Sequence, residues 1–292
     1  MDIPLFQGMN RITAVAYNEK GFSSNAKYVD VLCSRTDLPK PKMYALGIGV
    51  SKYSRLPREW QLSYAHTDAR AIIDALKKQD ERLFGQVNSK LLINKEANVA
   101  AIIDGLESLG GMSENDIAVI FLAGHGIMGK DGIFYYVTSE GNLENPEKGG
   151  LSWKMLDEHL AKIKGRVIIL LDACHSGSIS TETVVPNDEL AQRLRSEGRT
   201  GVMVFAASKG RQSALESPDL GGGFGAFAYA VTLALGPKSK EADLNNNGFV
   251  EFMELVEYVG RSVDKETEGE QTPWLSRKEL FGDFAIATVL KK

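Results

Sequence analysis

The sequence predicts an α/β protein, a three-layer sandwich in which a mostly parallel central sheet of about six strands is flanked by helices. From Met43 onward, short apolar runs alternate with amphipathic stretches that have helical spacing. Several runs, such as IAVIFLAG at 117–124, are apolar at every position, which is typical of strands buried on both faces. Strands of this kind separated by helices indicate parallel pairing with helical crossovers.

The expected elements follow one another in a regular order. Helices are expected at 64–78, 98–109, 153–163, 224–235 and 252–263. Strands are expected at 44–50, 91–93, 117–124, 166–172, 201–207 and 284–290. No internal repeat and no low-complexity tract interrupts this order, so a solenoid or an array is excluded.

The first part of the chain differs from the rest. Residues 8–33 read as two β-prone runs separated by a turn region, so a β-hairpin is expected there. The segment SRTDLPKPK at 34–42 has two prolines and several charges, as a linker would. We therefore expect a hairpin extension with its linker at 1–42 and a main domain at 43–292. A hairpin is marginally stable alone, so it either packs on the main domain or ends a β-sandwich domain whose upstream part is absent.

The composition excludes several classes of protein. With 43% hydrophobic and 25% charged residues, the chain is typical of a globular protein. A formal net charge of −4 without a dense Lys/Arg block predicts no binding to nucleic acid or to an anionic membrane surface. No membrane-spanning run and no signal peptide are recognised, and the two cysteines imply no disulfide framework. We expect a cytoplasmic protein.

Two of the predicted strand ends carry reactive side chains. In an open parallel sheet, reactive groups gather beyond the carboxyl ends of the strands. His125 follows the run at 117–124 within Gly-His-Gly, and Cys174 lies in DACHSG just after the run RVIILL. One strand–helix–strand crossover separates them, and adjacent strands are about 4.8 Å apart. This spacing predicts a Cys/His dyad in which a thiolate attacks a carbonyl carbon.

Other interpretations of these residues exist. Free cysteines are often buried, so the alternative is a buried thiol beside a structural glycine turn. His175 directly follows the cysteine, but neighbouring side chains in an extended or turning chain point apart, so we favour His125 as the base. His66 and His159 lie in helix-like stretches, where surface or packing roles are expected.

With GHG after one strand and DACHSG after the next, the chain resembles the caspase-like cysteine peptidases, specifically the metacaspase and prokaryotic caspase-homologue branch. The resemblance covers about residues 43 to 290 and includes the segments at 62–76 and 222–231, which are similar to an early and a late helix of the family. The chain departs from the animal caspase pattern Q-A-C-[RQG]-G, since Asp172 stands in place of Gln. Cleavage after aspartate is therefore not expected.

The resemblance implies roles for individual residues. His125 would be the general base or acid and Cys174 the nucleophile, with the backbone N–H groups of Gly126 and Cys174 as the oxyanion hole. Asp68 and Asp172 would line the pocket for the side chain that precedes the scissile bond. Two carboxylates at one pocket favour a guanidinium, so we expect cleavage after Arg in preference to Lys. Without the resemblance, Asp68 would be interpreted as a helix-surface carboxylate.

One further motif has the pattern of a calcium loop. The segment 243–254 satisfies D-x-[DN]-x-[DN]-G-x5-E, with candidate ligands at Asp243, Asn245, Asn247 and Glu254. The stretch before it is a poor entering helix, so a metal-free turn at a helix N-terminus is the alternative. We expect no cofactor for the chemistry itself and retain Ca²⁺ as a candidate ligand.

The polar segment at 178–200 carries Arg193, Arg195 and Arg199. It is either a solvated insertion with a short helix at 189–194 or an activation loop that the enzyme cuts after a basic residue. The expected partners are protein or peptide substrates, together with a regulatory partner or an upstream domain. The rival function is a catalytically idle caspase-fold module that binds peptides or partners, and a nucleotide-binding protein is disfavoured because no G-x-x-x-x-G-K-[ST] occurs.

Overall fold

The computed structural model describes residues 5, 8–14, 16–19, 24, 27–35, 37–142, 144–173, 201–209, 212, 214–277 and 283–290. Its central sheet has six strands in the order β14-β10-β9-β5-β3-β4. These strands are β3 (Lys42–Gly49), β4 (Gln86–Ile93), β5 (Ile117–Gly124), β9 (Arg166–Ala173), β10 (Val202–Ala206) and β14 (Trp274–Arg277). All pairs are parallel except β10 with β14, so the predicted mostly parallel α/β sheet is confirmed.

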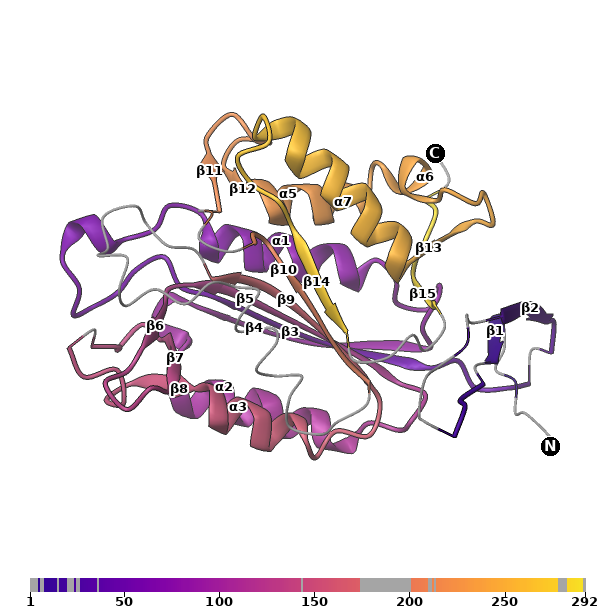
Figure 1. Ribbon diagram of the computed structural model, residues 1–292, viewed down its shortest axis with the longest axis horizontal. Helices are drawn as coiled ribbons and strands as arrows, with labels where there is room; N and C mark the ends of the chain where they lie inside the picture. The colour runs from indigo at the N-terminus through magenta and orange to yellow at the C-terminus, as the bar shows by residue number, and fades with distance from the viewer. Residues whose placement is uncertain are drawn as a thin grey trace.

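Helices cover both faces of this sheet, which makes the three layers seen in Figure 1. One layer contains α1 (Ala65–Lys77), α5 (Ala226–Ala234) and α7 (Phe252–Glu266). The other contains α2 (Val99–Glu107) and α3 (Trp153–Leu160). A short helix of four residues, α6 (Ser239–Ala242), precedes α7. Because both faces are covered, β5 is buried at every position, which is why its sequence does not alternate.

Local sequence explains where the helices begin. The Asn98 side chain accepts the Ala101 N–H at the start of α2, and the Ser152 hydroxyl accepts the Met155 N–H at the start of α3. α1 lies close against β3 because Gly49 has no side chain there, and a Cβ at this position would clash with the Ala65 carbonyl. This close approach places the first turn of α1 above the carboxyl end of the sheet.

Four small sheets and three short 3₁₀ turns complete the described chain. Three of the sheets are pairs: β1 (Gly8–Ala14) with β2 (Lys27–Cys33), β11 (Glu216–Ser217) with β12 (Phe224–Gly225), and β13 (Phe249–Glu251) with β15 (Ala285–Thr288). The fourth has three strands, with β7 (Phe134–Val137) between β6 (Gly126–Met128) and β8 (Gly150–Ser152). The turns are η1 (Arg58–Trp60), η2 (Asn94–Glu96) and η3 (Ser108–Gly111). The expected hairpin within 8–33 is thus present as β1 and β2, while the division into domains at residue 42 stays a prediction.

The last apolar run has a different role from the other expected strands. It forms β15, which pairs with β13 outside the central sheet, and the sixth central strand is β14, a segment for which no strand was expected. Ile286 and Ala287 of β15 are nonetheless fully buried, so their apolar character reflects packing rather than membership of the sheet. Among the described residues, no helix is both long and apolar enough to cross a bilayer.

Candidate active site

His125 lies at the carboxyl edge of the central sheet, directly after β5. The final register pair between β5 and β9 joins Gly124 to Ala173, so His125 and Cys174 are the residues that follow this pair on the two neighbouring strands. Cys174 itself lies outside the described residues, as does His175. The three candidate cleavage sites, Arg193, Arg195 and Arg199, lie outside them as well.

The His125 imidazole is buried, with 1% of the residue exposed, and its tautomer follows from one hydrogen bond. Its Nε2 lies 2.7 Å from the carbonyl oxygen of Trp60. A carbonyl can only accept, so Nε2 must carry the proton and donate it. In the neutral ring, Nδ1 is then the nitrogen without a hydrogen, which is the one that can act as a base.

Aromatic side chains hold the imidazole from two sides. The Tyr53 ring stacks on it with centroids 4.9 Å apart, and the Trp60 ring meets it edge-on at 5.6 Å. The Tyr53 hydroxyl also accepts the His125 backbone N–H at 2.9 Å. His125 is therefore held by aromatic packing against its ring and by hydrogen bonds to its backbone N–H and to its imidazole.

The two glycines that flank His125 are explained by aromatic packing. A Cβ at Gly124 would lie 2.9 Å from the hydroxyl oxygens of Tyr53 and Tyr136, and a Cβ at Gly126 would clash with the ring of Phe134. The Val137 N–H donates to the His125 carbonyl, so Gly126 occupies the next, non-hydrogen-bonded position of the β6–β7 ladder. Its N–H is directed away from β7.

Asp68 and Asp172 come together in the structure although 104 positions separate them in the chain. They are 2% and 3% exposed, so Asp68 is not a helix-surface carboxylate. Both oxygens of Asp68 accept the Gly225 N–H, at 3.2 and 3.3 Å. A Cβ at Gly225 would lie 3.0 Å from Asp68 Oδ2 and 3.4 Å from Asp172 Oδ2, so both carboxylates face the same point.

A third carboxylate, Glu216, joins this pair and was missed by sequence reasoning. Its two oxygens accept the N–H groups of Ser63 and Tyr64, at 3.0 and 3.3 Å, just before α1. Burial raises the pKa of Asp68 well above its usual range, and the neighbouring Asp172 and Glu216 raise it further against the opposing effect of the Gly225 N–H. Burial also raises the pKa of Glu216. No local pattern marks Glu216, because its partners are 152 and 153 residues away. We call Asp68, Asp172 and Glu216 the acidic cluster.

A buried glutamine holds the segment that leads into Glu216. The Gln271 side-chain amide donates to the Ala207 carbonyl and accepts the Leu215 N–H, both at 2.8 Å. Gln271 is fully buried between α7 and β14. Its side chain thus links the residue after β10 to Leu215, the residue before Glu216. These two hydrogen bonds help to position Glu216 in the acidic cluster.

The other histidines have local partners. His66 Nδ1 lies 2.8 Å from the hydroxyl of buried Ser51, and burial is the main cause of its lowered pKa. His159 Nδ1 donates to the Met155 carbonyl at 2.7 Å within α3. Neither contact involves the acidic cluster or His125.

The candidate calcium loop is closed by its own hydrogen bonds. Glu254 accepts the N–H groups of Leu244 and Asn245 through one oxygen and that of Glu251 through the other. Asp243 accepts two further N–H groups of the loop. Within the described part of the chain, no group of three or more His, Cys, Asp or Glu side chains is arranged to hold a metal ion. Calcium binding stays a prediction.

The fold and this edge of the sheet define an α/β sandwich protein with reactive and charged side chains beyond the carboxyl ends of its strands. A family model of the caspase domain matches residues 42–285, which is most of the chain. The chain therefore belongs to the caspase-domain family, and this membership supports a peptidase of the cysteine class.

Among solved structures, a protein from Geobacter sulfurreducens determined as a structural genomics target is similar, with a TM-score of 0.58 and 16% identity. The similarity covers 86% of this chain and 100% of that one, and at this identity it concerns the fold alone. No curated protein matches the chain by sequence.

Proposed function

We propose that this protein is a cysteine endopeptidase that uses Cys174 and His125 to cleave peptide bonds after basic residues, Arg in preference to Lys. Its membership of the caspase-domain family supports the general activity. The observation that carries the specificity is the acidic cluster, in which Asp68 and Asp172 face Gly225 and Glu216 acts electrostatically on Asp68. We include in the proposal that the enzyme acts in the cytoplasm, where a reducing environment keeps Cys174 as a thiol.

The dyad is supported by the register of the sheet and by the tautomer of the histidine. His125 and Cys174 directly follow the paired residues Gly124 and Ala173, so chain connectivity keeps them close. His125 Nδ1 removes the thiol proton, and the Cys174 thiolate attacks the carbonyl carbon of the scissile bond. The same nitrogen then returns the proton to the departing amine, which leaves a thioester that water hydrolyses.

Two backbone groups are proposed to stabilise the negative charge on the substrate oxygen. The N–H of Gly126 is directed away from β7, and Cys174 is the next residue in the chain after the last residue of β9. Donors of this kind act because they are already oriented before the charge develops. The Trp60 carbonyl supports the same step, because its bond to Nε2–H strengthens when the imidazole becomes positively charged.

Specificity for Arg is supported by charge and burial. Buried Asp68 and Asp172 and half-buried Glu216 repel one another when ionised, which raises the pKa of Asp68 beyond the effect of burial itself. A guanidinium would relieve this repulsion and offers planar, bidentate hydrogen bonds, whereas an ammonium is a point charge. An aspartate side chain would add a further negative charge, so it is not accepted.

Self-processing belongs to the same proposal. Arg193, Arg195 and Arg199 are basic residues in the segment between β9 and β10, and each fits the proposed specificity. The proposed partners are protein or peptide substrates. A regulatory partner or an upstream domain is proposed in addition.

The test is a library of peptides that vary only in the residue before the scissile bond, assayed with wild type and with Cys174→Ala. We expect cleavage after Arg, weaker cleavage after Lys, and none by Cys174→Ala. Cleavage after Asp with Arg peptides intact would overturn the acidic cluster as the specificity pocket. Peptide binding without turnover by wild type would favour the catalytically idle module instead.

A further inference from the structure

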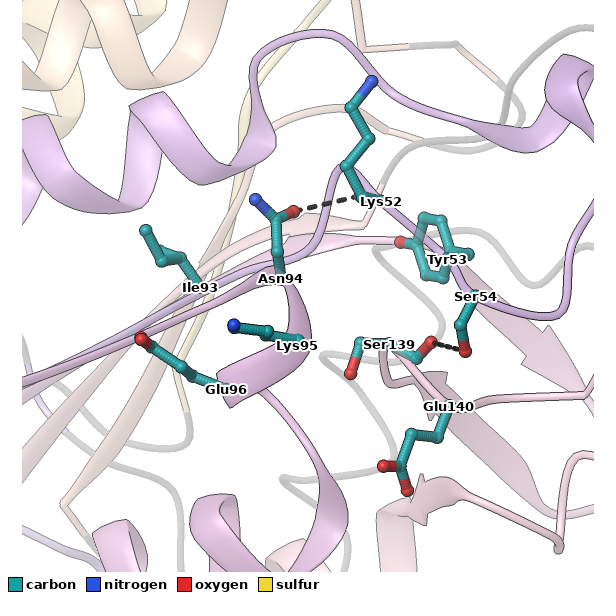
Figure 2. Close-up of a pocket in the computed structure, with 9 residues that line it drawn as sticks. All are labelled: Lys52, Tyr53, Ser54, Ile93, Asn94, Lys95, Glu96, Ser139 and Glu140. Atoms are coloured by element: carbon teal, nitrogen blue, oxygen red, sulfur yellow. Dashed lines mark hydrogen bonds between the residues drawn. The ribbon is translucent and has the colours of Figure 1, made fainter.

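A cavity of about 590 Å³ opens next to His125 and is not used by the dyad or by the acidic cluster. It lies where β3, β4 and β7 end (Figure 2). Its lining residues come from the ends of these strands and the segments after them, and are labelled in Figure 2. Its volume is within the range of about 300 to 1,000 Å³ that small ligands occupy in proteins.

One wall of this cavity is shared with the candidate active site. Tyr53 lines the cavity, stacks on the His125 imidazole with centroids 4.9 Å apart, and accepts the His125 backbone N–H through its hydroxyl. The Tyr53 ring covers one face of the imidazole, so Tyr53 is a wall common to the cavity and the candidate active site.

The walls are held in place by hydrogen bonds. Asn94 Oδ1 accepts the N–H groups of Ser51 and Lys52, at 2.9 and 3.0 Å. Ser54 donates both its N–H and its hydroxyl to the Ser139 carbonyl at 3.0 Å (Figure 2). Asn94 also has a positive φ of 47°, a conformation that Asn tolerates better than most residues. The cavity is therefore formed before any ligand arrives.

Most of its lining residues are polar, but more of the lining surface is apolar than polar, and charges of both signs lie among them. Hydroxyl and amide groups come from Ser54, Asn94 and Ser139, and the rim has the cations Lys52 and Lys95 and the anions Glu96 and Glu140. The single oxygen of the Asn94 amide already accepts two N–H groups, which fixes the amide plane, and the amide nitrogen is a donor of the kind that suits a peptide carbonyl. A peptide segment, which combines a polar backbone with side chains that have apolar parts, fits this mixed lining.

The order of the strands separates the cavity from the acidic cluster. His125 follows β5, Asp172 is on β9 and Glu216 comes after β10, whereas the cavity lies at the ends of β3 and β4. If the side chain before the scissile bond enters the acidic cluster, the segment after that bond must pass the histidine, because this histidine protonates the departing nitrogen. That segment then reaches the cavity.

We propose that this cavity binds the part of a peptide substrate that follows the scissile bond, a segment of the leaving peptide. The inference rests on the proposed function, and it adds a second binding site to the same catalytic centre. It predicts that substrates with residues on the leaving side are cleaved more efficiently than substrates that end in a small leaving group.

The experiment compares two substrates with the same Arg-ending acyl part. One has a coumarin amide as its leaving group, and the other is an internally quenched peptide that continues for four polar residues. The readout is the ratio of kcat/KM for the extended peptide to kcat/KM for the coumarin amide. Two variants, Lys95→Trp and Glu140→Trp, place bulk in the cavity from different elements, and Lys154→Trp on the exposed side of α3 is the matched control.

We expect the ratio to exceed one in wild type, to fall about tenfold in each cavity variant and to be the same as wild type in the control. The proposed subsite is overturned if neither cavity variant changes the ratio. It is also overturned if the two cavity variants and the control lower the ratio equally. If wild type cleaves neither substrate, the proposed function itself is overturned, which is a separate outcome from the first.

Discussion

The carbonyl oxygen of Trp60 lies 2.7 Å from Nε2 of His125, 65 residues further along the chain. This contact assigns the proton to Nε2 and leaves Nδ1 as the base. Trp60 is presented by the 3₁₀ turn η1, and Gln61 holds that turn: its side chain accepts the Tyr53 N–H at 2.8 Å and donates to the Tyr53 and Leu56 carbonyls. Gln61 is therefore a positioning residue for the base.

We predict that Gln61→Leu lowers kcat about tenfold with a smaller change in KM, because the histidine loses its fixed orientation while the acidic cluster is untouched. The measurement is the pH profile of kcat, in which the limb that reports the base should shift. Gln86→Leu on the exposed part of β4 is the control. A loss of protein stability with an unchanged profile would assign Gln61 a purely structural role.

We predict that Cys174→Ala and His125→Ala each lower peptidase activity by about a thousandfold or more, and that the double variant is little worse than either single one, because the two residues act as a unit. Circular dichroism should show that the fold persists. Two fragments cut at Arg193, Arg195 or Arg199 should form in wild type and be absent in Cys174→Ala. Near wild-type turnover by Cys174→Ala would disprove the mechanism.

Replacing one buried carboxylate should separate stability from activity. We predict that Asp68→Asn raises the Tm by about 2–4 °C near pH 7.5, equivalent to ~1 kcal/mol in a domain of this size, because Asn cannot ionise beside Asp172 and Glu216 and still gives the Gly225 N–H an acceptor. The same variant should lower kcat/KM for Arg substrates about tenfold or more. Asp74→Asn on the exposed side of α1 is the control for both measurements. A fall in Tm with unchanged Arg cleavage would contradict this account.

The raised pKa of Asp68 also predicts a pH dependence. A carboxyl whose pKa is higher in the folded than in the unfolded protein contributes stability below its unfolded pKa, and this contribution is lost as the pH rises through the folded pKa. Binding of Arg has the opposite dependence, because the guanidinium needs ionised carboxylates. We therefore expect kcat/KM for Arg relative to a neutral residue to rise with pH, with a midpoint above the ordinary carboxyl range of about 4. Asp68→Asn should remove part of this rise. A ratio that does not change with pH in wild type would exclude the ionisation of the acidic cluster as a requirement for Arg binding.

The calcium prediction concerns Glu254, whose side chain completes the capping box of α7 with Glu251 and accepts two N–H groups of the 243–254 loop. We expect Glu254→Ala to lower the Tm by an amount equivalent to ~1–2 kcal/mol, more than the exposed control Glu257→Ala. If the loop binds metal, millimolar Ca²⁺ raises the Tm of wild type and has no such effect on Glu254→Ala. Identical melting curves of wild type with Ca²⁺ and with chelator would remove the loop from the candidate metal sites.

The sequence by itself determined the parallel α/β core and the reactive strand ends. Runs without alternation marked β5 and β9 because hydrophobic periodicity is a local property that burial on both faces imposes directly. His125 could be located for the same reason, since it directly follows such a run. Asp68 and Asp172 were linked by family resemblance, because nothing local shows that a helical carboxylate turns inward.

Only the tertiary structure decided what surrounds these residues. The base is oriented by the carbonyl of Trp60, a group that every residue has and no sequence pattern can mark. Glu216 joins the acidic cluster through N–H groups more than 150 residues away, and β14 rather than the apolar β15 completes the central sheet. These features depend on which distant segments meet, and that is set by how the layers pack rather than by local side-chain pattern.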